Sequence, residues 1–327
     1  MGKKFASENA IKKVMDLSMK LFPNNEITSN EVNDMWNEIN GPIGGSEEEL
    51  AKWNYTLDDV NNTVNLSKYI DDTATDVTVF DNYTKGDKTY KTKITSANQM
   101  FSDKTNLKTI TFNPGIDSSE CTIMSYMFYG CRNLKEINGL ENLDTSNVTI
   151  MTSMFSGYVG LISLDLTEWD TSKVTDMNGM FYRCNNLKEI KGLENWDVSN
   201  VTNMSNMFSK CKSLVTLNLT GWDTSNVTSM FSMFYECTAI TSINGLENLN
   251  TSNVTSMSYM FGTCKALTSL NLTSFDTSKV TGMYQMFVNC TKLTKIQVSK
   301  TKWVIKTGCD TTNMFDSCGV SEVTYVD

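Results

Sequence analysis

Nine cysteines are the residues of this 327-residue sequence that first suggest chemistry, because thiols can bind zinc or pair as disulfides. The chain has no histidine and no C-x-x-C motif, so the usual zinc ligand sets are missing. Tyr158 takes the cysteine position in one copy of the pattern, which favours packing over ligation. We therefore predict structural thiols, with a Cys309–Cys318 disulfide as the alternative. Seven cysteines share one position, three residues after the phenylalanine of a recurring Met-Phe pair: Cys131, Cys184, Cys211, Cys237, Cys264, Cys290 and Cys318.

An acidic position recurs with the same period. Carboxylates stacked ~5 Å apart in successive strands repel one another and could be bridged by calcium. A calcium loop needs several oxygen ligands per ion, however, and the D-T-S-N sequence supplies few of them. The aspartate can instead accept a hydrogen bond from the backbone of the Thr-Ser turn that follows it. We therefore predict turn-forming aspartates and no cofactor. The position is occupied by Asp144, Asp170, Asp197, Asp223 and Asp276, with Asn250 in the sixth copy.

Aromatic residues precede this acidic position in several copies, and tryptophans on a repetitive surface could stack on sugars. Leucine alternates with tryptophan at the position, however, which is typical of a hydrophobic slot. We therefore predict that these residues belong to the core, together with the sixteen methionines between Met100 and Met314. The aromatic position is occupied by Leu143, Trp169, Trp196, Trp222, Leu249 and Phe275.

The elements that carry these columns repeat as well. The Met-Phe pair recurs nine times, at steps of 26 to 28 residues. Each copy opens with an L-x-x-L-x-L strand signature, as in residues 161–166. It closes with apolar residues at i, i+3, i+4 and i+7, as in residues 177–184, which predicts a two-turn helix. The sequence therefore predicts an α/β solenoid of about nine 26–27-residue strand/short-helix units.

Two kinds of opening alternate along the array. Every second copy reads L-x-x-I-x-G-L and carries one extra residue beside Gly139, Gly192 or Gly245. An extra residue next to a glycine in a strand predicts a β-bulge.

The repeat resembles that of the BspA-type leucine-rich repeat surface proteins, in the branch with W-D-T-S-x-V-T-x-M-x-x-M-F-x-x-C repeats. Residues 222–230 read Trp-Asp-Thr-Ser-Asn-Val-Thr-Ser-Met, and they are followed by Met233-Phe234 and Cys237. The resemblance covers roughly residues 55–327. It implies surface display and adhesion or recognition, without naming a ligand.

The chain ahead of the repeats divides into two parts. The sequence predicts a helical docking segment over residues 1–45, followed by a linker and β capping region over residues 46–93. The solenoid follows over residues 94–327. Residues 3–45 also resemble N-terminal segments of phage tail-associated proteins, which implies virion docking or self-association. The apolar face of the predicted helices comprises Ile11, Val14, Met15, Val32, Met35, Trp36 and Ile39.

Charge and hydropathy argue against some functions. The formal net charge is −9, and nucleic-acid binders carry basic patches, so the charge argues against nucleic-acid binding. No apolar run approaches the ~18 residues of a membrane span. Residues 1–20 contain no apolar signal-peptide core, so we predict no secretion signal there. Residues 91–327 carry 19 basic and 21 acidic side chains, and such a nearly neutral polar surface suits glycan or protein contact.

The sequence contains no nucleophile–base pair and no phosphate loop, so we predict a non-enzymatic adhesion or recognition protein. It would bind a surface protein or glycan and stand on a cell surface. The alternative is a phage or injection-particle appendage, such as a receptor-binding or decoration protein. We predict that the outward-facing residues of the strands contact the ligand; the alternative is that this row of polar side chains is merely solvated. The residues are Thr111, Asn138, Asp165, Lys191, Asn218, Asn244, Asn271 and Gln297.

Overall fold

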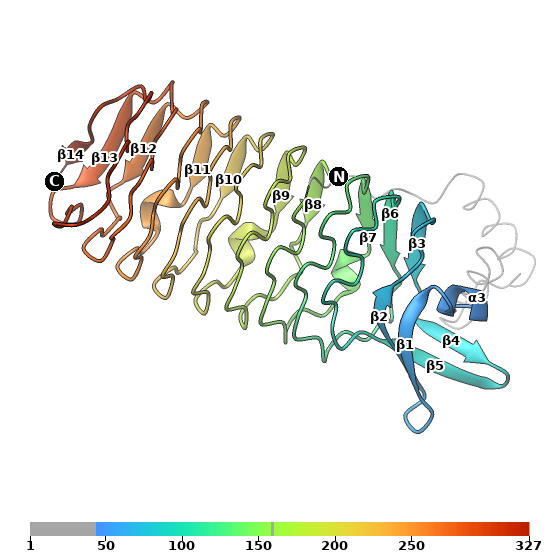
Figure 1. The fold of residues 1–327 in the computed structure, drawn as a ribbon. Helices are drawn as coiled ribbons and strands as arrows, with labels where there is room; N and C mark the ends of the chain where they lie inside the picture. The colour runs from blue at the N-terminus through green and yellow to red at the C-terminus, as the bar shows by residue number, and fades with distance from the viewer. Residues whose placement is uncertain (1–43, 158–159, 327) are drawn as a thin grey trace, which may run out of the picture.

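The computed structural model describes residues 44–157 and 160–326. They form one elongated solenoid, with a small β sheet at its N-terminal end and strand β14 at its C-terminal end (Figure 1). The predicted leucine-rich-repeat solenoid is therefore confirmed. The predicted apolar helix face from Ile11 to Ile39 lies outside the described residues, as does Tyr158.

The N-terminal sheet closes the first turn of the array. Helix α3 precedes it, capped by the Ser46 hydroxyl, which accepts a hydrogen bond from the Glu49 N–H. Trp53 and Tyr69 from this sheet lie edge-on or tilted against the ring of Phe101, at 5.5 and 5.9 Å between centroids. The elements are α3 (Glu47–Leu50), β1 (Trp53–Asp58), β2 (Thr63–Tyr69), β4 (Asn82–Lys85) and β5 (Lys88–Lys93), in the sheet order β1-β2-β5-β4.

The remaining strands are short and pair in parallel, one from each turn of the solenoid. They form the sheets β3-β6-β7, β8-β9, β10-β11 and β12-β13-β14. Alternate side chains point into the core, as the L-x-L pattern predicts. The strands are β3 (Asp76–Val79), β6 (Thr109–Phe112), β7 (Glu136–Asn138), β8 (Ser163–Asp165), β9 (Glu189–Lys191), β10 (Thr216–Asn218), β11 (Ser242–Asn244), β12 (Ser269–Leu272), β13 (Lys295–Ser299) and β14 (Thr324–Val326).

The short helix predicted over each Met-Phe segment is wrong: the segment is a series of turns. Its backbone N–H groups donate alternately to carbonyls of the next copy and to carbonyls of the same copy. The Phe181 N–H donates to the Met207 carbonyl at 2.9 Å, and the Met180 N–H to the Met177 carbonyl at 3.2 Å. This geometry needs left-handed backbone just before each Met and two residues after each Phe. Such backbone occurs at all eighteen of these positions, and fifteen of them are not glycine.

A stack of phenylalanine rings runs through the core along the solenoid axis. The nine rings of the Met-Phe pairs lie 5.3–5.8 Å apart between successive centroids, with interplanar angles of 1–16°. The sixteen methionines surround this stack and are all buried, as predicted. The core is thus continuous from turn to turn, which a solenoid needs because no single turn can bury its own apolar face.

The β-bulges predicted beside the extra glycines are also wrong. Each glycine ends its strand in left-handed backbone and begins a 3-10 helix. These helices are Leu140–Asn142, Leu193–Asn195 and Leu246–Asn248. The parallel sheets break after the strands that precede these glycines, β7, β9 and β11, so the breaks recur in every second copy of the repeat, as the extra residue does.

Candidate functional site

The predicted strand-face residues do align on the outer side of the sheets. Parallel pairing places Asn218 beside Asn244, and Asn271 beside Gln297. Six of the eight side chains are exposed, and those of Thr111 and Gln297 are half-buried. We call this row the strand face; its role in binding stays a prediction.

Part of the hydrogen-bonding capacity of the strand face serves the fold. The Oδ1 atoms of Asp165, Asn218 and Asn271 each accept the backbone N–H of the threonine two residues on, at 3.2 Å. Asn138 donates weakly to the Thr111 hydroxyl at 3.5 Å, and Lys191 lies 4.0 Å from Glu189. The exposed amide NH₂ groups of Asn218 and Asn271 could donate to a ligand, but their oxygens are already engaged.

The aspartate column forms turns, as the non-metal interpretation predicts. Each Asp or Asn accepts the backbone N–H of the serine two residues on; Asp170, for example, accepts from Ser172 at 2.9 Å. The same contact occurs at Asp144, Asp197, Asp223, Asn250 and Asp276. Hydrogen bonds from these serines hold the pKa of Asp170, Asp223 and Asp276 below its usual range. Within residues 44–157 and 160–326, no cluster of three Cys, Asp or Glu side chains could hold a metal.

These lowered pKa values predict acid-sensitive stability. A carboxylate with a lowered folded-state pKa contributes stability above its unfolded pKa of ~3.9, and that stability is lost as pH falls through the folded value. We expect the urea concentration at the unfolding midpoint of the wild type to decrease as the pH is lowered below about 4. The triple variant Asp170→Asn, Asp223→Asn and Asp276→Asn should show a shallower acid dependence, since Asn250 makes the same contact without titrating. Identical acid profiles for the two proteins would contradict this prediction.

The cysteine column is buried and hydrogen-bonded to backbone. In six copies the thiol donates to the carbonyl of the phenylalanine one copy earlier, at 2.9–3.1 Å. Burial raises the pKa of Cys131 and Cys290 to about 12. All nine cysteines are free thiols, so the structure contains no Cys309–Cys318 disulfide, and both of these residues are half-buried.

Thiol reactivity tests this arrangement. With Ellman's reagent at pH 8 we expect the native protein to react at Cys309 and Cys318 alone, because thiols that are buried and protonated do not attack. Nine thiols should react in guanidinium. If a Cys309–Cys318 disulfide formed instead, the native protein would show no reactive thiol and the denatured protein seven.

The tryptophan column is buried, as predicted. Trp169, Trp196 and Trp222 are each at most 4% exposed. The indole N–H of Trp222 donates to the Leu193 carbonyl at 2.7 Å, at the start of a 3-10 helix in the preceding copy. These rings therefore cannot stack on an external sugar.

A different set of aromatic residues does reach the surface, on the outer side of the Met-Phe turns, which we call the turn face. Phe231, Tyr235, Tyr259 and Tyr284 form what we call the aromatic turn cluster. Tyr259 lies at its centre, 5.9 Å from Phe231, 5.4 Å from Tyr235 and 5.2 Å from Tyr284 between ring centroids, each pair edge-to-face. Phe231 is 37% exposed. Three successive copies of the repeat thus contribute to one cluster.

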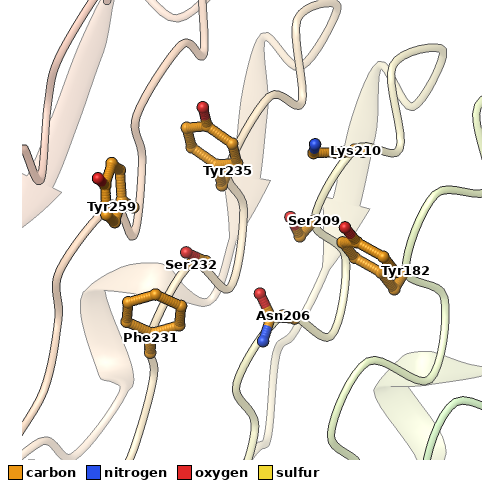
Figure 2. Close-up of a pocket in the computed structure, with 8 residues that line it drawn as sticks. All are labelled: Tyr182, Asn206, Ser209, Lys210, Phe231, Ser232, Tyr235 and Tyr259. Carbon is orange, nitrogen blue, oxygen red and sulfur yellow. The ribbon is translucent and has the colours of Figure 1, made fainter.

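A shallow pocket of about 240 Å³ lies beside this cluster. Figure 2 shows Phe231, Tyr235 and Tyr259 on one side of it and Tyr182 with Lys210 on the other. Polar side chains lie between them. The lining residues are Tyr182, Asn206, Ser209, Lys210, Phe231, Ser232, Tyr235 and Tyr259.

The pocket is polar but balanced in charge. The Lys210 ammonium lies 3.5 Å from the Glu236 carboxylate and 5.8 Å from the centroid of the Tyr235 ring. Burial raises the pKa of Tyr235 and of Tyr259. A phenol has an ordinary pKa of ~10, so both hydroxyls are protonated at neutral pH and can donate. Aromatic walls with a few convergent polar groups are typical of small-ligand sites.

Sequence reasoning missed this pocket because it treated the closing segment as a helix with one buried face. The signal was present: Tyr182, Phe231, Tyr235 and Tyr259 stand next to the buried Met-Phe pairs, at positions where other copies have small polar residues. They occupy three different positions of the repeat, so no single column reveals them.

Comparison with known protein families identifies one repeat family. A family model described as "Mycoplasma protein of unknown function, DUF285" matches residues 59–161, 95–215, 159–246 and 215–324. No curated protein sequence matches the chain.

Within residues 44–157 and 160–326, no helix has the length and apolar character to cross a bilayer.

Several solved structures are similar to this chain. One is a leucine-rich repeat protein of T. pallidum, with 15% identity, coverage of 66% of this chain and 88% of that one, and a TM-score of 0.37. Another is a leucine-rich cell surface protein of Faecalibacterium prausnitzii, with 21% identity, 76% and 53% coverage, and a TM-score of 0.40. A third is a leucine-rich repeat protein of Bacteroides ovatus, with 15% identity, 84% and 98% coverage, and a TM-score of 0.26.

Proposed function

The chain belongs to the DUF285 repeat family, and from that premise we propose that it is a non-enzymatic recognition protein, displayed on a surface, that binds a surface protein or glycan through its repeat array. The observation that carries the proposal is the aromatic turn cluster. The array buries its phenylalanine, methionine and tryptophan columns, yet exposes Phe231 beside a pocket. Exposed aromatic clusters next to polar groups are typical of binding surfaces.

The surface setting rests on the resemblance of the repeat to BspA-type surface proteins. The nearly neutral array, with 19 basic and 21 acidic side chains after residue 90, also suits contact with a protein or glycan. Virion attachment would depend on residues 1–45, and we keep it as an outcome of the localisation test.

Binding to cells tests the recognition function. Fluorescently labelled protein would be titrated onto intact epithelial cells and onto cells of the source organism. We expect saturable binding that unlabelled protein displaces. The variant Tyr235→Ala/Tyr259→Ala should lose it, whereas Asn218→Ala/Asn244→Ala/Asn271→Ala should retain it, because the two variants alter different faces of the array.

Each alternative result has a defined meaning. Loss of binding only in the asparagine variant would move the site to the strand face. Non-saturable binding on both cell types would overturn the recognition function. Circular dichroism spectra and melting curves of both variants serve as the folding control.

Localisation is tested separately by quantitative proteomics of the source cells. We expect the protein in envelope fractions and accessible to trypsin on intact cells. Enrichment in density-purified particles would instead support the appendage and make residues 1–45 the docking segment.

A further inference from the structure

We propose that the pocket between Tyr182 and Tyr259 is a carbohydrate subsite that takes a neutral pyranose ring. The inference deepens the proposed function and rests on it, because it names the ligand class for the same surface. Four features of the pocket carry it: an unpartnered hydroxyl, an aromatic wall, the backbone conformation of Tyr259 and the balance of charge.

The hydroxyl is that of Ser209, which lines the pocket. Ser209 is 1% exposed, and its Oγ has no hydrogen-bond partner among the residues that the structure describes. An unsatisfied buried hydroxyl costs stability, and in the lining of a pocket it offers a ligand a free donor and acceptor. A hydroxyl of a sugar can both donate to and accept from it.

The aromatic wall matches the apolar faces of a pyranose. Phe231, Tyr235 and Tyr259 lie edge-to-face, with interplanar angles of 72° and 80° to Tyr259, so the wall is angled rather than flat. Sugar rings present C–H groups on their faces and hydroxyls around their edges. The phenolic hydroxyls, the Asn206 amide and the Ser209 hydroxyl supply donors and acceptors for those edges.

The backbone of Tyr259 is strained. Its φ is 59°, in the left-handed region that bulky side chains rarely adopt. Other copies place residues such as Asn206 and Asn313 at the same left-handed position, and asparagine adopts this conformation more readily. Because every copy needs this conformation, what is unusual at Tyr259 is the residue type: a tyrosine costs stability here where an asparagine would cost less.

The charge balance selects a neutral ligand. Lys210, the cation in the pocket, is paired with Glu236, whose other carboxylate oxygen lies 3.5 Å from Lys212. A phosphate or uronate would have to compete with Glu236 for Lys210. A quaternary ammonium ion would meet the Lys210 charge inside its aromatic walls, which opposes cation–π binding there.

The spacing of the array suits a longer sugar chain. Hydrogen-bonded turns lie ~5 Å apart, and the centroids of successive rings in the phenylalanine stack lie 5.3–5.8 Å apart, which is close to the length of one pyranose unit in an extended polysaccharide. A second exposed pair, Tyr126 and Tyr129, lies further along the same turn face, with ring centroids 5.6 Å apart. Tyr126 is left-handed at the same repeat position as Tyr259, with a φ of 56°. A bound chain would therefore contact more than one copy.

Isothermal titration of the full chain tests the inference. The probes are maltohexaose, cellohexaose and mannohexaose as neutral sugars, with hexagalacturonate, inorganic phosphate and choline as charged comparisons. We expect at least one neutral hexaose to bind and the charged probes to give no heat at the same concentration.

Three variants assign the binding to the pocket. Tyr259→Asn should weaken binding about tenfold or more while keeping or raising the melting temperature. Ser209→Ala should weaken it about three- to tenfold without lowering the melting temperature, since it removes an unsatisfied hydroxyl. Tyr55→Ala, which removes an exposed ring on β1, is the matched control and should bind like the wild type.

The inference is overturned if no neutral hexaose binds, if choline or hexagalacturonate binds in its place, or if Tyr259→Asn binds sugar like the wild type. Periodate treatment of the target cells separates it from the proposed function. If binding to cells depends on Tyr259 but survives periodate and is not displaced by any hexaose, the carbohydrate assignment fails while recognition stands. If neither cells nor sugars bind, both fail.

Discussion

Replacing Phe208 with alanine should lower the free energy of unfolding by about 3 to 5 kcal/mol, the usual range for a buried aromatic ring. Phe208 is fully buried and stacks against Phe181 at 5.5 Å and Phe234 at 5.8 Å between centroids. The variant removes both ring contacts and leaves a cavity in the middle of the core. The change would be measured by urea unfolding followed by circular dichroism.

The position of Phe208 adds a second expected effect. In a solenoid each turn contacts only its neighbours, so a gap in the middle of the stack weakens the coupling between the two halves. We expect a broader unfolding transition than in the wild type, or two transitions. A single transition of unchanged slope would mean that the ring stack does not couple the turns.

Two control variants calibrate this result. Phe315 ends the stack, is partly buried and contacts one ring, Phe287, at 5.5 Å, so Phe315→Ala should cost clearly less than Phe208→Ala. Val215 is 47% exposed, and Val215→Ala should change stability by no more than about 0.5 kcal/mol. Equal losses for Phe208→Ala and Phe315→Ala would contradict the stack as the source of stability.

The sequence was sufficient to predict the solenoid and its core columns. The Met-Phe period and the L-x-x-L-x-L signature identify which residues share a position, and the burial of Trp169, Trp222 and the methionines follows from that alignment. Periodicity is informative here because each copy repeats the same environment, so a substitution such as leucine for tryptophan reveals a hydrophobic slot.

The backbone of the Met-Phe segment could not be predicted in the same way. Apolar residues at i, i+3, i+4 and i+7 are compatible with a helix and with the observed turns. What separates the two is the partner of each N–H: Phe181 donates to Met207, 26 residues away, and a local pattern cannot show that. Left-handed residues such as Glu236 and Thr263 give no warning, because neither favours that conformation.

The candidate site was hidden for a related reason. An alignment of repeats reveals columns, and the strand face is one. The aromatic turn cluster instead combines Phe231, Tyr235 and Tyr259, which hold three different positions in two neighbouring copies. Their proximity becomes visible only when the turns are stacked and their outer positions are known.

Replacing Gly192 with alanine should lower the free energy of unfolding by about 2 to 4 kcal/mol, the second large effect that we expect. Gly192 has a φ of 89°, and a Cβ at this position would lie 2.5 Å from the backbone N and Cα of Thr167 in the preceding copy. The variant combines backbone strain with a backbone clash that no side-chain rotation can relieve. The loss would be measured by urea unfolding, as for Phe208→Ala.

Gly308 provides the matched control, because it has the same φ of 89° and a Cβ added there would meet no atom within 4 Å. Gly308→Ala should therefore report the backbone strain alone, about 1 kcal/mol. The difference between the two variants measures how closely one copy of the repeat approaches the next at the extra residue. Equal losses would mean that left-handed backbone alone, and not contact between copies, requires glycine in every second turn.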